Sequence, residues 1–214
     1  MRGASLTEEE AESLREGNPL MEGVINYVFT KAAAVAQRPD AVHFLDPVVA
    51  HTMCAFDDAS LGPVDEMCRM LLVAIPIAEY KGTGYDGVHW SLLLLQRVSV
   101  DVPFVALRLD SLSDENAARC LSFLRLLQSC SKCSEHIPPS STRIDFPSQK
   151  NNVDCGCFVC MAALHVAEAV KSWNKGGGGD SAKGISDGTL EFPPQWDASR
   201  FRRALLDEIL RDRV

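Results

Sequence analysis

Residues 155–173 read CGCFVCMAALHVAEAVKSW, and this segment decides the fold. Its apolar residues recur at helical spacing and cover nearly every side of the first turns, which is typical of a buried helix. Such a helix needs protein on all of its faces. The sequence therefore predicts layers of strands and helices packed around it, and these are found upstream in the chain.

Four short segments upstream of this helix predict β-strands. They lie at 71–77 (LLVAIPI), 88–95 (VHWSLLLL), 104–109 (FVALRL) and, in a shorter form, near 142–146. Apolar stretches of this length, bounded by turn-forming residues, are typical of buried strands. The second follows a loop punctuated by glycines, and the third ends at Asp110 and Ser111.

Helical spacing of apolar residues marks four further segments. They are 20–37, 47–56, 113–129 with Ser113 as the expected N-cap, and a C-terminal helix capped by Asp197. The stretch GGGGDSAKG at 176–184 is expected to be a flexible loop. This order of elements predicts one α+β domain over residues 1–214, with three or more strands packed by helices.

Composition argues against several classes of protein. Apolar residues make up 46% and charged residues 23% of the 214, which is ordinary for a soluble globular protein. No run approaches the roughly 18 apolar residues of a membrane span, and the first residues contain no apolar signal segment. We therefore expect an intracellular protein of the cytoplasm or nucleus, in which the eight cysteines are reduced thiols. The net charge of −8, without a dense basic cluster, argues against nucleic-acid binding.

Four side chains suited to acyl transfer stand at the edges of the predicted elements: His89, Asp110, Gln149 and Cys155. A helix N-terminus favours the thiolate form of a cysteine, and a neighbouring imidazole can take and later return the proton. A carboxylate on the other ring nitrogen would orient that imidazole. The Gln149 amide and the main-chain N–H of Cys155 are the natural donors for the oxyanion of a tetrahedral intermediate.

Each of these residues has an ordinary structural explanation when it is taken alone. A histidine on an apolar strand is more often a core residue, and an aspartate at a strand end is usually a turn residue. One cysteine among eight is structural by default. Their occurrence together, in one order and at element edges, favours the catalytic interpretation.

These residues lie in motifs that resemble the ubiquitin-like-protein proteases of the Ulp/sentrin type. The matching motifs are VHWSLL at 88–93, DS at 110–111 and QKNNVDCG at 149–156. The active-site order of that family is His, Asp, Gln, Cys, whereas papain-like enzymes place the Cys before the His. The stretch HFLDPVVA at 43–50, the strand at 71–77 and the closing helix also resemble the small deneddylase branch. That branch removes the neddylation modifier, while larger relatives act on SUMO.

The resemblance implies a papain-like, Ulp-type fold, with a central mixed sheet packed by helices and the nucleophile at the start of a buried helix. It implies that Cys155 is the nucleophile, His89 the general base and acid, Asp110 the orienting carboxylate and Gln149 the oxyanion donor. Trp90 would form one wall of a narrow tunnel that admits only a Gly-Gly tail.

The partner implied by the resemblance is a ubiquitin-like modifier, either the neddylation modifier or SUMO, together with its conjugates. No cofactor, metal, nucleic acid or membrane is implied, and we expect a monomer. One departure concerns the first long helix, where the family usually carries a second Trp followed by Leu-Asn-Asp. Here the stretch is PLMEGVI at 19–25, with Glu22 where an Asp is expected. Glu22 is a candidate contact for a basic residue near the modifier's tail.

Three alternatives stay open at this stage. Two C-x-x-C pairs, Cys130 with Cys133 and Cys157 with Cys160, have the spacing of a structural zinc site. Because the Trp that the family usually carries on the first long helix is missing, the protein could also bind a modifier without cleaving it. The same active site also serves acetyl transfer in some bacterial effectors that resemble this protease clan, although the Trp after His89 favours a peptide tunnel.

Overall fold

The computed structural model describes residues 6–79, 89–130, 134–172 and 190–212. The elements in chain order are α1 (Glu8–Glu12), α2 (Glu22–Ala36), β1 (Val42–Phe44), α3 (Pro47–Ala55), the 3-10 helix η1 (Ala59–Leu61), α4 (Val64–Met67), β2 (Leu72–Glu79), β3 (His89–Gln96), β4 (Val105–Leu109), α5 (Ala117–Ser129), β5 (Thr142–Arg143), α6 (Cys155–Ser172) and α8 (Ala198–Asp212). The predicted helices and strands are all present, and the strand expected near 142–146 is shortened to two residues. The predicted loop at 176–184 lies outside the described residues.

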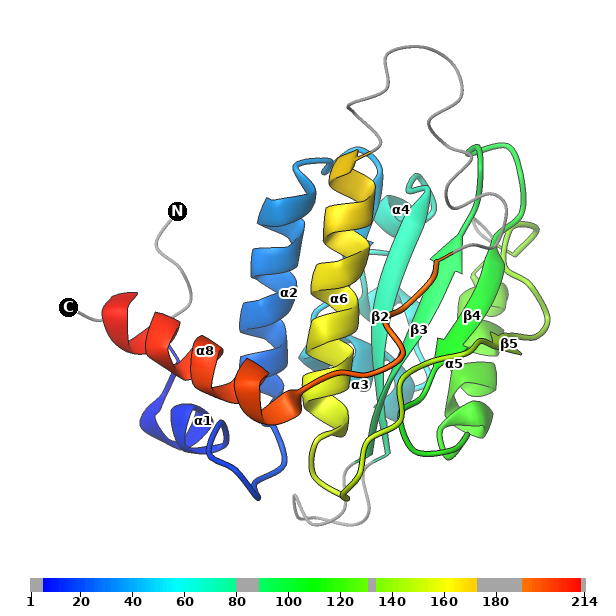
Figure 1. Ribbon diagram of the computed structural model, residues 1–214. Coiled ribbons are helices and arrows are strands. Elements are labelled where there is room, and N and C mark those ends of the chain that lie inside the picture. The colour runs from blue at the N-terminus through cyan, green and yellow to red at the C-terminus, as the bar shows by residue number, and fades with distance from the viewer. Residues whose placement is uncertain (1–5, 80–88, 131–133, 173–189, 213–214) are drawn as a thin grey trace.

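The strands form one mixed sheet in the order β1-β2-β3-β4-β5 (Figure 1). β2, β3 and β4 are antiparallel neighbours, while β1 and β5 add parallel to the two edges. Helices cover both faces of this sheet, so the chain has an α+β fold, as the sequence predicts.

β3 is buried along its whole length because both faces of the sheet are covered. Side chains alternate along a strand. Trp90, Leu92 and Leu94 accordingly join the core beneath α2, α6 and α8, whereas Leu93 and Leu95 join the core beneath α3 and α5. This double burial explains why the strand appears in the sequence as a continuous apolar run.

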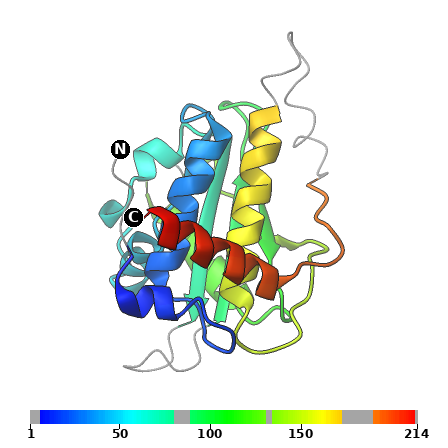
Figure 2. The ribbon, with the colours of Figure 1, turned by 60° about the vertical axis from the view of Figure 1, so that its left-hand side comes forward.

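α6 is the central helix of the first core. It packs against α2 and β3, and α8 lies across α2 and α6 (Figure 2). Among the described residues it is the one helix long and apolar enough to cross a membrane by length and composition, but most of it is buried inside the fold. Its apolar surface is therefore accounted for by packing within the domain.

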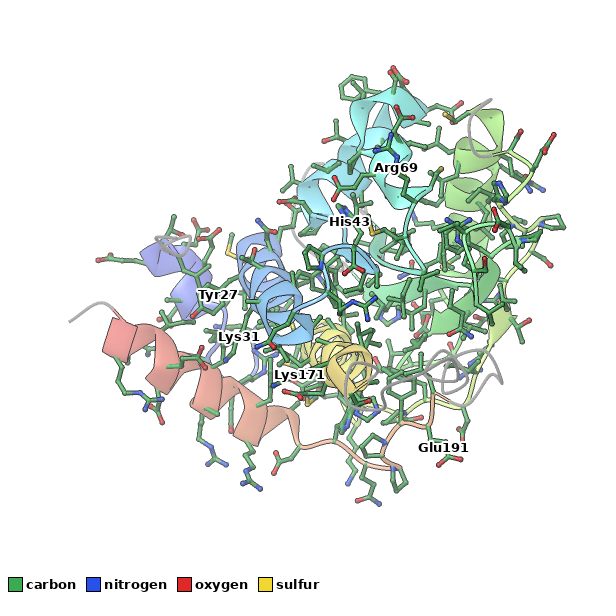
Figure 3. The ribbon with its side chains drawn as sticks, turned by 90° about the horizontal axis from the view of Figure 1, so that it is seen from above. Tyr27, Lys31, His43, Arg69, Lys171 and Glu191 are labelled. Atoms are coloured by element: carbon green, nitrogen blue, oxygen red, sulfur yellow. The ribbon has the colours of Figure 1, made fainter. Side chains whose placement is uncertain are left out.

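α8 is also held to α2 by polar contacts. Tyr27 and Lys31 lie on the side of α2 that faces α8 (Figure 3). The Tyr27 hydroxyl donates a 3.4 Å hydrogen bond to Glu208, and the Lys31 ammonium forms an ion pair with the same carboxylate. These contacts fix the position of the C-terminal helix over the domain.

Two local predictions are wrong. α5 begins at Ala117 rather than near Ser113, and its N-cap residue Asn116 makes no side-chain capping bond. The Asn116 amide nitrogen donates to two strand carbonyls, and its Oδ1 accepts no hydrogen bond from the described residues. Cys68 is disulfide-bonded, whereas reduced thiols are expected throughout. The prediction of reduced thiols came from composition and the expected location of the protein, and neither of these shows which cysteines lie close enough to form a disulfide.

Candidate active site

The ends of three elements meet at one edge of the fold. β3 and β4 are antiparallel, so the beginning of β3 lies beside the end of β4. α6 begins at the same end of the molecule (Figure 1). This topology brings together His89 at the start of β3, Asp110 after β4 and Cys155 at the start of α6.

His89 and Asp110 form a buried pair. Nε2 of His89 lies 2.8 Å from Oδ1 of Asp110, and the two side chains are only 6% and 2% exposed. A carboxylate taken out of water is expensive unless hydrogen bonds replace its hydration. Asp110 receives them from the main-chain N–H of Leu112 at 3.0 Å and of Asn116 at 3.5 Å. Burial alone raises the pKa of Asp110, but these bonds and His89 outweigh it and hold the pKa below its ordinary value.

Asn116 also fixes the strand from which His89 projects. Its amide donates hydrogen bonds to the main-chain carbonyls of His89, at 2.9 Å, and of Ile77, at 3.3 Å. Asn116 is only 1% exposed. One buried side chain therefore holds the backbone on which the imidazole stands, while its own N–H contacts the partner carboxylate.

The Cys155 thiol lies against the same imidazole. Because Asp110 occupies Nε2, Nδ1 is the ring nitrogen available to the sulfur, and Nδ1 has no nitrogen or oxygen partner among the described residues. Burial by itself lowers the pKa of His89. The hydrogen bonds and negative charges of Asp110 and Cys155 outweigh that effect and raise the pKa to about 10. The site therefore favours an imidazolium in contact with the Cys155 sulfur.

Gln149 enters the site from the loop before α6. Its main-chain N–H bonds the carbonyl of Ser111 at 2.8 Å, and its Oε1 accepts a 2.6 Å hydrogen bond from the Ser111 hydroxyl. Its Nε2 donates to the carbonyl of Asn151. A primary amide carries two N–H groups, so one of them is left for another acceptor.

Gly156 serves a purpose different from the one that a turn would require. It lies inside the first turn of α6, and a Cβ added there would stand 2.8 Å from Cβ of Leu20. A glycine is needed at this position because the segment that leads into α2 lies too close to α6 for a larger side chain.

The two predicted substrate-binding residues lie in different environments. Glu22 is the first residue of α2, near the Leu20 contact with α6; partial burial, and then the nearby Asp46 carboxylate, raise its pKa. Trp90 is 2% exposed and packs in the first core cluster. It also borders a pocket of about 450 Å³ beside Ala78 and Arg119. The tunnel and tail-binding roles stay predictions.

The other buried cysteines are chemically different from a nucleophile. Burial raises the pKa of Cys120 and of Cys157 to about 12, and it raises the pKa of Cys160 well above its ordinary value. Cys157 and Cys160 lie inside α6, and Cys133 of the other C-x-x-C pair is outside the described residues. Over the described part of the chain, no group of three or more His, Cys, Asp or Glu side chains is arranged to hold a metal ion.

Sequence reasoning missed four polar residues that hold the site together: Ser111, Asn116, Asn151 and Arg202. Ser111 lies inside a quoted motif, but nothing in the motif shows that it contacts Gln149. Arg202 is 1% exposed although it lies in a helix whose basic residues otherwise face solvent. A mostly polar, charged helix gives no local signal that one of its arginines is buried.

A thiol at a helix N-terminus beside an imidazole, with a buried carboxylate behind that imidazole, is the arrangement of the thiol-protease class. The sequence matches the Ulp1 protease family, C-terminal catalytic domain, over residues 70–176, which is half of the chain. The chain belongs to this family. None of the curated proteins compared with it matches the sequence.

Solved structures share the fold at low sequence identity. The SUMO protease Ulp1 with its catalytic cysteine oxidised to a sulfenic acid has a TM-score of 0.58 at 20% identity, over 97% of this chain and 84% of that one. A de-sumoylating protease has a TM-score of 0.66 at 14% identity, over 97% and 86%. The Xanthomonas campestris effector XopD, solved bound to ubiquitin, has a TM-score of 0.57 at 19% identity, over 90% and 92%.

Proposed function

We propose that this protein is a cysteine protease that cleaves after the Gly-Gly tail of a ubiquitin-like modifier. The observation that carries the proposal is the imidazole of His89, held by Asp110 at 2.8 Å and interacting with the Cys155 thiol at the start of α6. An intracellular location and a monomeric state belong to the same proposal.

The proposed reaction follows from these contacts. His89 holds the proton of the thiol, so that the Cys155 thiolate attacks the carbonyl of the last glycine. The resulting oxyanion is stabilised by the free N–H of Gln149 and by the main-chain N–H of Cys155. His89 then gives its proton to the leaving amine, and water hydrolyses the thioester with His89 as base. Asp110 keeps the ring oriented and stabilises the imidazolium throughout.

The neddylation modifier is the substrate that we propose first. Support comes from the sequence resemblance at HFLDPVVA, which forms the end of β1 and the beginning of α3. SUMO is the alternative, because the fold neighbours include Ulp1 solved with Smt3, the yeast ortholog of SUMO. Both precursor processing and isopeptide deconjugation use the same tail and the same carbonyl chemistry.

A second candidate function is modifier binding with weak turnover. The observation that favours it is the segment before and at the start of α2, where Leu20, Met21 and Glu22 lie and no Trp is present. Weaker binding of the tail would lower the fraction of bound modifier whose last carbonyl lies in position to react. The buried histidine–aspartate pair argues for the active enzyme.

The test is a panel of tail-reactive probes built on ubiquitin, SUMO and the neddylation modifier. Wild-type protein should be labelled, and Cys155→Ala should lose labelling and cleavage while still binding the modifier. Cys54→Ala removes an exposed thiol distant from the site in sequence and should behave as wild type. Labelling by the SUMO probe alone would show that the substrate is SUMO and not the neddylation modifier. Modifier binding without labelling or cleavage would establish the weak binder.

A further inference from the structure

Arg202 connects α8 to the end of the loop that leads into Cys155. Its side chain is 2% exposed. Nε and Nη2 donate to Oδ1 of Asp154 at 3.0 and 2.9 Å, and Nη2 also donates to the carbonyl of Val153 at 3.1 Å. Asp154 is the residue immediately before Cys155, and its carbonyl accepts the N–H of Phe158 in the first turn of α6.

The same guanidinium binds the N-terminal segment of the chain. Nη1 donates to the carbonyls of Ser13 at 2.9 Å and Arg15 at 3.3 Å, and Nη2 donates to that of Asn18 at 2.8 Å. Burying an arginine costs several kcal/mol unless its donors are satisfied. Here the acceptors are supplied by two segments far apart in sequence, so the buried charge holds both of them to α8.

Asp154, which is held by Arg202, in turn holds Asn151 in the loop before α6. Its Oδ2 accepts a 2.8 Å hydrogen bond from Nδ2 of Asn151. Oδ1 of Asn151 in turn accepts the main-chain N–H groups of Val153 and Asp154, each at 3.0 Å. The side chain of Asn151 therefore closes the turn that leads into α6, and Asp154 holds that side chain in place.

The main-chain carbonyl of Asn151 completes the connection to Gln149. It accepts a hydrogen bond from Nε2 of Gln149. A carbonyl can only accept, so this contact determines which end of the carboxamide is nitrogen and turns the oxygen toward the Ser111 hydroxyl. An unbroken series of contacts thus runs from α8 to the carboxamide.

We propose that Arg202 is a positioning residue for the oxyanion donor and acts on Gln149 through Asp154 and Asn151. The inference rests on the proposed function, because it assumes that Gln149 donates to the oxyanion. It makes α8 a working part of the active site, although this helix lies outside the matched family region of residues 70–176. Displacing a positioned group by about 1 Å can cost 100-fold in rate.

Two variants of the protein interrupt the series at different points. Asn151→Asp keeps the shape and the Oδ acceptor, but it replaces the donor to Asp154 with a repelling carboxylate. Asn152→Asp is its control, because it introduces the same charge one residue away on an exposed side chain with no hydrogen bond in the described structure. Arg202→Lys keeps the charge and loses the fork geometry, and Arg203→Lys is its exposed control in the same helix.

Three measurements separate positioning from folding. They are kcat and KM on a modifier with a fluorogenic C-terminal amide, the affinity of a peptide aldehyde ending in Gly-Gly, and the alkylation rate of Cys155 by iodoacetamide. The aldehyde accepts the Cys155 sulfur at its carbonyl carbon, and the carbonyl oxygen takes the negative charge or a proton, so its adduct uses the oxyanion donor. Alkylation displaces iodide and forms no oxyanion.

Asn151→Asp and Arg202→Lys should lower kcat and aldehyde affinity by about 10- to 100-fold with KM changed less than about twofold. In Asn151→Asp the alkylation rate should stay within about twofold of wild type, since no oxyanion forms in that reaction. The two controls should match wild type. If Arg202→Lys does not fold, Asn151→Asp decides alone, because its side chain is exposed.

Wild-type kcat and aldehyde affinity in Asn151→Asp would overturn the inference, and so would a parallel fall in kcat, alkylation rate and folded fraction. Gln149→Ala tests the assumption beneath it, and wild-type activity of that variant would remove Gln149 from the proposed mechanism. If the wild-type protein cleaved no modifier, the proposed substrate class would fail, whereas the aldehyde and alkylation comparison would still decide the positioning role.

Discussion

The hydroxyl of Ser111 donates a 2.6 Å hydrogen bond to Oε1 of Gln149, and the Gln149 main-chain N–H bonds back to the Ser111 carbonyl at 2.8 Å. This reciprocal pair joins the turn after β4 to the loop before α6. Because Asp110 is the neighbour of Ser111, one short stretch of backbone carries both the carboxylate proposed to orient the imidazole and the residue that holds Gln149.

Replacing Ser111 by Ala should lower kcat by roughly 10- to 100-fold and leave KM nearly unchanged, because the carboxamide loses the bond that holds its oxygen. Steady-state kinetics on the preferred modifier substrate checks this. Ser113→Ala, on an exposed side chain of the same turn, is the control. An unchanged kcat in Ser111→Ala would mean that the backbone bond alone positions Gln149.

Replacing Asp110 by Asn should reduce kcat by roughly 100- to 10,000-fold while the protein stays folded. The amide fits the same space but cannot stabilise the imidazolium as a carboxylate does. Asp114→Asn provides the comparison, since it weakens a partly exposed ion pair with Arg108 outside the site. A loss of less than tenfold in Asp110→Asn would argue against the orienting role.

The pH dependence of cleavage should show a loss of activity on the acidic side, because a cysteine nucleophile reacts as a thiolate and not as a thiol. On the basic side, His89 has a pKa raised to about 10, so the proton it gives to the leaving amine should persist to that range. The raised value also stabilises the folded state, fully below pH about 6.5 and decreasingly as pH rises through about 10.

In the Asp110→Asn variant, the basic limb of the pH profile should move to lower pH, since Asp110 is one of the groups that raise the pKa of His89. A profile of kcat/KM against pH, recorded for both proteins, measures the shift. A basic limb at the same pH in both proteins would show that another group controls it.

Replacing Gly156 by Ala should destabilise the protein by about 1–3 kcal/mol, because the added methyl group meets Leu20 at 2.8 Å. Urea unfolding measures the change. Adding Leu20→Ala should recover part of the loss, so the two substitutions should be clearly non-additive. Strict additivity would place the strain elsewhere.

Local patterns in the sequence were enough to predict the elements and the residue types of the site. Continuous apolar runs predicted β2 and β3, and helical periodicity predicted α2 and α6, because each signal arises from neighbours along the chain. His89, Asp110, Gln149 and Cys155 could be selected because their order and flanking residues resemble one family. The structure brings the imidazole to both the carboxylate and the thiol.

The contacts that support those side chains depend on how the elements pack in three dimensions. Arg202 contacts Ser13, which lies 189 positions earlier in the chain, and Gly156 is required by Leu20 rather than by its own turn. The disulfide of Cys68 and the amide of Asn116 are likewise settled by proximity in space. Periodicity reports which face of an element is buried. It does not show which polar group from a distant part of the chain contacts that buried face, since this depends on how the elements pack.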